Sequence, residues 1–333
     1  MTNTVESMQP STSGAVHTSS TPRKGCQSFS LNVDHPLTGE PDDSLDELLH
    51  VLWTVSAVSV LFNFHQDRVH LKQYAKRLRE EVANSLAQEN VVYNAEVSVM
   101  KNKTSDSLDS PPIKIEVYSK TNGTTEGPGK CIYKGILLSC KNSSQKLGIR
   151  NAVRLPLLLC RGTRGAMGIV HKVLKHMFDC LITALPIGED DLMWLVPIII
   201  YPTHELYPKS TDELQMEYRI PELADRDSIV IKFKIEDVIK ILKVIVDLNK
   251  NVTATGVTFT LDHIEKFREV LYTEMLGCAR LQLGLCTLHK ITLPGVTLVG
   301  NKMKSVKPGT MNRILLYMND KAFDTLHAMN IDI

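Results

Sequence analysis

The stretch that decides the fold is RLPLLLCRGTRGAMGIVHKVLKHMFDC, residues 154–180. An apolar run leads into a loop with three glycines and two arginines, and apolar residues then recur at helical spacing. The pattern predicts a strand, a tight turn and a helix that continues to about residue 185, where Pro186 and Gly188 end it. Because phosphate-binding loops share this strand, glycine loop and helix arrangement, the stretch raises the question of nucleotide binding.

The glycine spacing does not match a known phosphate loop. A Walker loop needs two glycines separated by four residues and followed by Lys and Ser or Thr. Here Gly162, Gly165 and Gly168 are separated by two residues each, and the Gly-x-Gly of dinucleotide sites is also missing. GTRG matches the backbone clamp of KH domains, but that loop joins two helices. We interpret the glycines as a tight turn, and a nucleotide- or small-molecule-binding enzyme that uses the Gly162–Gly168 loop is the alternative.

Other catalytic and metal patterns are weak. The sequence has no G-x-S-x-G motif, and no cysteine lies in a protease signature. His171, His176 and Cys180 share a predicted helix, but the two histidines are five residues apart and point in different directions. GEDD at 188–191 is interpreted as a helix cap or a solvated loop rather than a divalent-ion site. We therefore assign no catalytic residues and expect no metal and no cofactor.

Composition limits the class of protein. The chain has 333 residues and a net charge of +1, so its total charge does not indicate a polyanion partner. No apolar run reaches about 18 residues, so we expect no membrane span. The N-terminal residues lack the apolar core of a signal peptide. Seven scattered cysteines, an odd number, suit a reducing compartment, and we expect a cytosolic or nuclear protein.

The N-terminal region is predicted to change from disorder to order near residue 44. Residues 1–43 are rich in Ser, Thr, Pro and Gly and have few large apolar side chains, so we expect a disordered tail. A helix is predicted to begin at Ser44, with Glu47 completing a capping box. Alternating apolar residues then predict a strand over 58–64.

The rest of the chain alternates between strand and helix patterns. A helix over 68–87 is predicted to expose the cations Lys72, Lys76, Arg77 and Arg79. Residues 191–201 read as a buried strand or a broken helix, since Pro197 excludes an unbroken helix. The remaining expected strands are 91–100, 113–120, 131–140, 214–220, 229–235, 279–288, 295–300 and 313–319, and the remaining expected helices are 236–249, 261–277 and 321–329.

These patterns predict an α+β fold with mainly antiparallel β-sheets flanked by helices, because consecutive strands are joined by polar connections. We expect a division into an N-terminal half, residues 44–187, and a C-terminal half, residues 188–333.

The charge distribution is more informative than the net charge. Between Gly127 and Phe178 there is no Asp or Glu, and a further acid-free run extends from Asn301 to Arg313. Few aromatic residues interrupt the first run, so duplex backbone fits better than stacked single-stranded bases. A solvated face is the equally weighted alternative. The basic residues of the first run are Lys130, Lys134, Lys141, Lys146, Arg150, Arg154, Arg161, Arg164, Lys172 and Lys175.

Three segments together resemble a known family, that of centromere protein L. They are LLHVLWTVSAVSVLFNFHQDRVHLKQYAKRLRE, LPLLLCRGT and IVHKVLKHMFDCLITAL, and the region around Trp194 and EKFREVLY fits more loosely. The resemblance covers most of 44–330, with departures at 95–130 and 200–230. The matching positions are Leu48, Leu49, His50, Trp53, Thr54, Phe64, Leu71, Lys72, Tyr74, Leu155–Leu157 and Phe178–Cys180.

The resemblance implies a non-enzymatic subunit of the inner kinetochore, located in the nucleus at the centromere of the chromosome, that supports kinetochore assembly and chromosome segregation during cell division. It implies a heterodimer with a centromere protein N-like subunit through the C-terminal half, contacts with other inner-kinetochore subunits, and a basic channel for duplex DNA beside the centromeric nucleosome. It also implies curved antiparallel sheets. A homodimeric scaffold with no DNA role is a weaker third hypothesis.

Two sets of site residues follow. Strands 279–288 and 313–319 are candidates for edge pairing with the partner, although ordinary core strands are the alternative. The expected partner-binding residues are Leu281, Leu283, Leu285, Ile314, Leu316 and Tyr317. The expected DNA-binding residues are Arg154, Arg161, Arg164, Lys172, Lys175, Lys302, Lys304 and Lys307.

Overall fold

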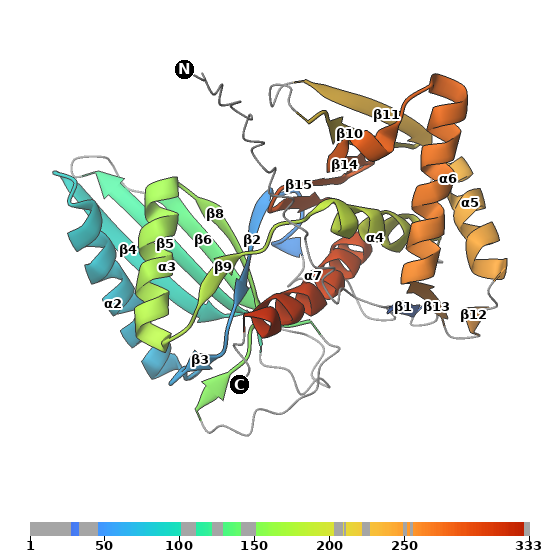
Figure 1. Ribbon diagram of the computed structural model, residues 1–333. Coiled ribbons are helices and arrows are strands. Elements are labelled where there is room, and N and C mark those ends of the chain that lie inside the picture. The colour runs from blue at the N-terminus through green and yellow to red at the C-terminus, as the bar shows by residue number, and fades with distance from the viewer. Residues whose placement is uncertain are drawn as a thin grey trace, which may run out of the picture.

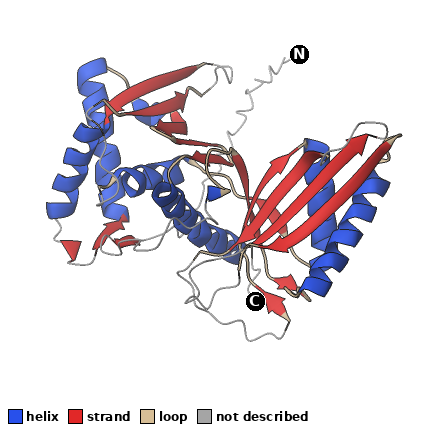
Figure 2. Ribbon diagram, turned by 180° about the vertical axis from the view of Figure 1, so that it is seen from behind, coloured by secondary structure: helices blue, strands red, loops and turns tan. Residues whose placement is uncertain are grey.

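A long antiparallel sheet runs through the molecule and carries helices on both of its faces (Figures 1 and 2). The computed structural model describes residues 28–32, 46–100, 111–121, 129–140, 151–202, 209, 211–221, 227–248, 252–253 and 256–329. Within these ranges no helix combines the length and the apolar character needed to cross a membrane. The architecture confirms the predicted α+β class with mainly antiparallel strands.

The large sheet joins residues from both halves of the chain. Its strands follow the order β11-β10-β14-β15-β16-β2-β8-β6-β5-β4. The short strand β9 pairs with the last three residues of β2, and β16 pairs with the first two. Because β16 pairs with β2, the sheet continues across the expected boundary at residue 187. The bounds are β2 Trp53–Val58, β4 Val91–Val99, β5 Ile113–Thr121, β6 Lys130–Leu138, β8 Leu157–Gly162, β9 Ile182–Ala184, β10 Glu213–Arg219, β11 Ser228–Lys234, β14 Thr287–Leu293, β15 Val296–Val299 and β16 Lys302–Ser305.

Helices α2 (Arg68–Leu86) and α3 (Arg164–Phe178) cover one face of β4, β5, β6 and β8 (Figure 1). Their apolar stripes bury Leu78 and Val82 of α2 and Val170 and Leu174 of α3. The helix predicted over 68–87 is confirmed. The prediction that the second helix reaches residue 185 is wrong, because Asp179 adopts a left-handed conformation (φ 45°) and residues 182–184 form β9.

The opposite face of β2, β6 and β8 joins the larger core, which also contains the helices of the C-terminal half. Trp53 and Leu159 are fully buried there, together with Met193 of α4 and Ile314 of α7. These helices are α4 (Glu189–Ile200), α5 (Ile235–Leu248), α6 (Leu261–Ala279) and α7 (Pro308–Ala328).

The strand prediction for residues 313–319 is wrong, because they lie in the middle of α7. The five consecutive apolar residues from Ile314 to Met318 are too few to distinguish the period of a helix from that of a strand. Over the whole helix, however, buried Met311, Ile314, Leu315, Met318 and Ala322 recur at intervals of three and four, and Pro308 occupies the first turn, where its missing N–H costs nothing.

The strand prediction for residues 279–288 is wrong for 279–286, and only its last two residues lie in a strand, β14. Helix α6 continues to Ala279, Arg280 reverses the chain with φ 57°, and Leu283–Leu285 form a single 3-10 turn before β14 begins. Neither residues 289–293 of β14 nor strand β16 was predicted, although both belong to the antiparallel series β14–β15–β16.

The prediction that Pro197 excludes an unbroken helix over 191–201 is wrong, because residues 191–200 lie in one helix, α4, which continues through Pro197. Arg313 of α7 lies against its C-terminal end, where Nη1 donates to the carbonyl oxygens of Ile198 (2.9 Å), Ile199 (3.3 Å) and Tyr201 (3.0 Å). These carbonyls lie in the last turn of the helix, where intrahelical partners are missing. A buried arginine thus satisfies the end of a helix that the sequence predicted to be broken.

The expectation of a disordered tail over 1–43 is wrong for residues 28–32, which form β1 (Ser28–Asn32). This strand pairs with β13 (Gly256–Thr260) and buries Phe29 and Leu31. Residues 1–27 and 33–43 lie outside the described residues.

The next predicted elements are also revised. Ser44 is outside the described residues, Asp46 is helical, and 47–50 form turns rather than a continuation of the predicted helix. The strand expected over 58–64 is reduced to β3 (Leu61–Phe62), because β2 already ends at Val58.

Candidate nucleic-acid interface

The glycine loop is a strand-to-helix turn between β8 and α3. A Cβ on Gly162 would lie 2.4 Å from the carbonyl oxygen of Ile132, so this position requires glycine. The N–H of Thr163 donates to the same oxygen (3.0 Å), and the Thr163 hydroxyl accepts from the N–H of Ala166 (3.3 Å), which caps α3. Gly168 lies within the helix with open space around it. The tight-turn interpretation is confirmed for Gly162.

Of the possible nucleophiles and ligands near this turn, Cys160 and Cys180 are buried, His171 is half-buried and His176 is exposed. Burial raises the pKa of the Cys160 and Cys180 thiols to about 12, which opposes thiolate chemistry. Burial, followed by the charge of Lys175, lowers the pKa of His171 to about 4, so its imidazole is neutral at physiological pH. Within the described part of the chain, no three His, Cys, Asp or Glu residues gather as a metal site.

The GEDD segment is a helix cap, which is one of the two interpretations made from the sequence. Its acids occupy the first turn of α4, where Asp191 accepts the N–H of Gly188 (2.7 Å), the Tyr317 hydroxyl (3.0 Å) and the Lys321 ammonium. Arg268 of α6 donates to Asp190 (2.6 Å). These carboxylates connect α4 to α6 and α7, so their charges are used inside the fold.

Three predicted DNA-binding residues, Arg164, Lys172 and Lys175, lie on α3. Arg164 and Lys172 are exposed and Lys175 is half-buried. None of the three makes an ion pair with another described residue. The first turn of α3 also lacks an acidic residue, so the positive end of the helix dipole adds to the potential of Arg164.

Lys302 and Lys304 of β16 belong to the same side of the sheet as α3. Lys302 pairs with Thr54 of β2, which pairs with Cys160 of β8, and directly paired residues share a face. Cys160 packs in the core beneath α3, so Lys302 and Lys304, two residues further on, lie on that face. We call Arg164, Lys172, Lys175, Lys302 and Lys304 the α3–β16 cations.

The structure separates the other three predicted DNA-binding residues from this set. Arg161 alternates with Cys160 and therefore points to the opposite face, where its guanidinium lies 5.8 Å from the ring centroid of Trp53. The half-buried Arg154 lies over the ring of Phe323 in α7 at 5.3 Å. Lys307 is exposed and precedes α7. The eight residues do not form a single surface.

One cation of the acid-free run is neutralised inside the fold. Lys134 donates to Glu47 (2.8 Å) and lies 3.4 Å from Glu116, and Lys114 also contacts Glu47 at 3.2 Å. The hydrogen bond from Lys134 is the main reason that the pKa of Glu47 is lowered. This pairing could not be predicted from the sequence, because Glu47 is 87 residues from Lys134. Lys141, Lys146 and Arg150 lie outside the described residues.

The predicted partner-binding residues do not lie on an open strand edge. Leu283 is buried in the 3-10 turn, Ile314 and Tyr317 are buried in α7, and Leu281 and Leu316 are half-buried. Leu285 is 67% exposed. The terminal strands of the large sheet are β11 and β4, so the strand basis for choosing these six residues is wrong.

Comparison with known proteins gives one match. The family model described as "CENP-L: Centromere protein L" matches residues 47–326, from the turn before β2 to the last turns of α7. A search of curated proteins finds no match.

Proposed function

Because this chain belongs to the centromere protein L family, whose members are kinetochore subunits at the centromere, we propose that it contributes a DNA-binding face and a dimerisation face to that assembly. In this proposal the protein has no enzymatic activity. It binds duplex DNA through the α3–β16 cations, and it pairs with a centromere protein N-like subunit through its C-terminal half.

One observation supports the DNA role above the others. Five cations from α3 and β16 lie on one side of the sheet, and none forms an ion pair with a described residue. Each cation placed against a phosphate releases condensed counterion, so five contacts predict a salt slope of roughly −4. Affinity should then fall roughly 100- to 1,000-fold between 50 and 200 mM salt.

The DNA role is tested with a random-sequence duplex and fluorescence anisotropy on the full chain. We expect the variant R164E/K172E/K302E, which changes three exposed residues, to lose most of the affinity. The control K234E/K243E/K266E has the same charge change at exposed positions of β11, α5 and α6. Equal losses in both variants would contradict the assignment, because they would reflect net charge alone. R161E tests whether the opposite face contributes.

The dimerisation role is proposed for the edge strand of the C-terminal half. Strand β11 pairs with β10 on one side only among the described residues, and its Val230 side chain is 51% exposed. An open edge with an exposed β-branched residue suits strand addition by a partner subunit.

Coexpression with a centromere protein N-like subunit and copurification test this face. We expect V230E to reduce recovery of the complex at least roughly tenfold, because a buried carboxylate at the new interface has no partner. V92E on the other edge strand, β4, is the control, since Val92 is exposed to a similar extent, 55%. Full recovery with V230E would show that the partner binds elsewhere.

A further inference from the structure

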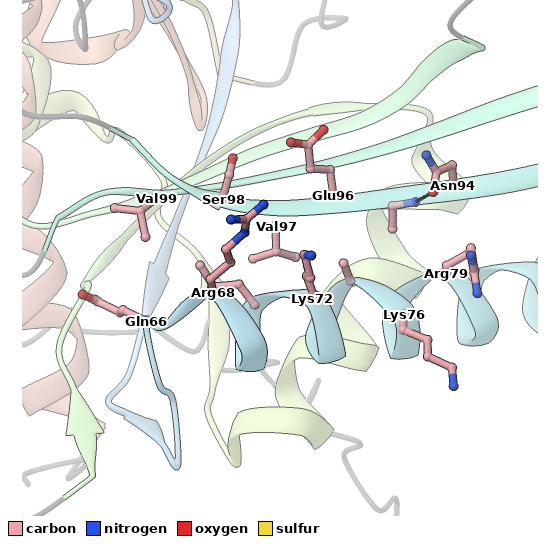
Figure 3. A pocket seen from close by; sticks show the side chains of 13 residues that line it. Gln66, Arg68, Lys72, Lys76, Arg79, Asn94, Glu96, Val97, Ser98 and Val99 are labelled. Carbon is pink, nitrogen blue, oxygen red and sulfur yellow. Dashed lines mark hydrogen bonds between the residues drawn. The ribbon is translucent and has the colours of Figure 1, made fainter.

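A groove lies between α2 and the edge strand β4, at the end of the sheet opposite β11 (Figure 3). Its volume is about 600 Å³. Apolar side chains, among them Leu71, Ala75 and Val97, form part of its wall, and cations follow its length. The basic residues that line it are Arg68, Lys72, Lys76 and Arg79.

The outer edge of β4 has unused backbone hydrogen-bonding groups. The N–H of Met100 donates to the carbonyl oxygen of Pro112, next to β5 (2.8 Å). Because backbone groups alternate in direction along an antiparallel strand, the N–H and C=O groups of even-numbered residues in β4 point to β5, and those of odd-numbered residues point to the open edge. The outward N–H of Ala95 donates to the Asn94 side chain (3.0 Å). The outward amides of Val97 and Val99 have no hydrogen-bond partner among the described residues.

The cations of α2 have the spacing of an extended chain. Arg68, Lys72 and Lys76 recur every four residues, about 6 Å along a helix, and alternate residues of a strand are about 6.6 Å apart. Lys76 lies 4.0 Å from Glu80, whereas Arg68 and Lys72 make no ion pair with a described residue. In Figure 3 Arg68 rises from the helix toward β4, and Glu96, the acid of the lining, points away from the helix.

We propose that β4 accepts an acidic, extended segment of a partner protein as an additional strand, with carboxylates at alternate positions facing Arg68 and Lys72. Main-chain pairing to Val97 and Val99 supplies affinity, and the cations select the charge. Duplex DNA fits this groove less well, because it offers no backbone amides to a sheet edge and no apolar side chains to the wall around Leu71. The proposal is independent of the DNA role assigned to α3 and β16.

The test measures binding of a fluorescent peptide with alternating Val and Glu, three of each, to the full chain. Two control peptides replace every Glu by Gln, or carry N-methyl groups on alternate backbone amides, which blocks strand pairing. We expect the Glu peptide to bind at least roughly tenfold more tightly than either control at 50 mM salt. Equal binding of the N-methylated peptide would overturn strand addition without requiring a change in the protein.

Two protein variants assign the site. R68E/K72E should weaken the Glu peptide roughly tenfold or more, whereas R77E/K266E, with the same charge change at exposed residues outside the groove, should leave affinity within about twofold. V97P removes an outward N–H without touching the pairing with β5 and should abolish binding. No peptide binding by the wild type, together with loss of duplex binding in R68E/K72E, would assign the cations to DNA and overturn the proposal.

Discussion

The N-terminus of α4 and the exposed side of α3 are both highly charged, with opposite signs and opposite uses. At α4, Asp190 and Asp191 contact Arg268, Tyr317 and Lys321 from two other helices. On α3, by contrast, neither Arg164 nor Lys172 forms an ion pair with any residue that the structure describes. The acids of the first region pair with side chains of other helices in the same chain, whereas Arg164 and Lys172 of the second region are exposed to solvent.

The difference follows from burial. The side chains of Asp191 and Lys321 are only 17% and 12% exposed, so each charge needs the other to offset the cost of leaving water. Exposed cations such as Lys172 stay hydrated and have no such requirement. Unpaired exposed charge is therefore compatible with the fold and is available for binding, whereas unpaired buried charge is not.

The largest loss of stability should come from removing the Asp191 carboxylate at the N-terminus of α4. D191A removes the helix cap and leaves Lys321 without its carboxylate, and we expect a loss of about 3 kcal/mol in the free energy of unfolding. Urea denaturation followed by circular dichroism measures the loss. D190A is the control, because this side chain is 85% exposed, and it should lose less than about 1 kcal/mol. Equal losses would contradict the burial argument.

The inner side of α3 carries a titratable group that should give the next effect. Because the folded protein lowers the pKa of His171 to about 4, the unfolded chain binds the proton first as pH falls below 6.5. The contribution of neutral His171 is complete above pH 6.5 and is lost toward pH 4, by about 2 kcal/mol after allowing for partial exposure. H171F should flatten unfolding free energy against pH in this window. An unchanged pH profile would contradict the assignment.

A smaller effect is expected where a cation of the acid-free run is neutralised. Lys134 keeps the pKa of Glu47 below its usual value, so this pairing stabilises the fold above the ordinary carboxyl pKa and the stabilisation is lost as pH falls through the lowered one. E47Q should cost about 0.5–1 kcal/mol at pH 7 and little at pH 3. Equal cost at both pH values, measured by urea denaturation, would show that packing rather than charge is responsible.

The smallest effect on stability should come from the α3 side. K172Q removes one exposed charge and should change the free energy of unfolding by less than about 0.5 kcal/mol. The same variant should make the salt slope of duplex binding shallower by about one. A stability loss as large as that of D191A would remove the distinction between the two regions.

Long, regular segments could be read from the sequence alone. The helix over 68–87 and the strands β4, β5 and β6 match their predictions, because their apolar residues hold one period over many positions. The strand prediction for residues 313–319 was wrong because a short apolar run has no clear period. The helix becomes evident only from the burial pattern along the whole of α7. The prediction of disorder was wrong for residues 28–32 because this strand is stabilised by pairing with β13, more than 200 residues away in the sequence.

The candidate site divides in the same way. The sequence by itself determined the class of the fold, the helical spacing that places Arg164 and Lys172 on one element, and the lack of nearby acids. Only the tertiary structure decided which cations remain available. It brings Glu47 to Lys134, places Arg154 over Phe323, points Arg161 to the other face and adds Lys302 to the α3 side. Local periodicity can be read from neighbouring residues. The pairing of a charge, and the face of the sheet to which its side chain points, depend on residues that come together only when the sheet forms.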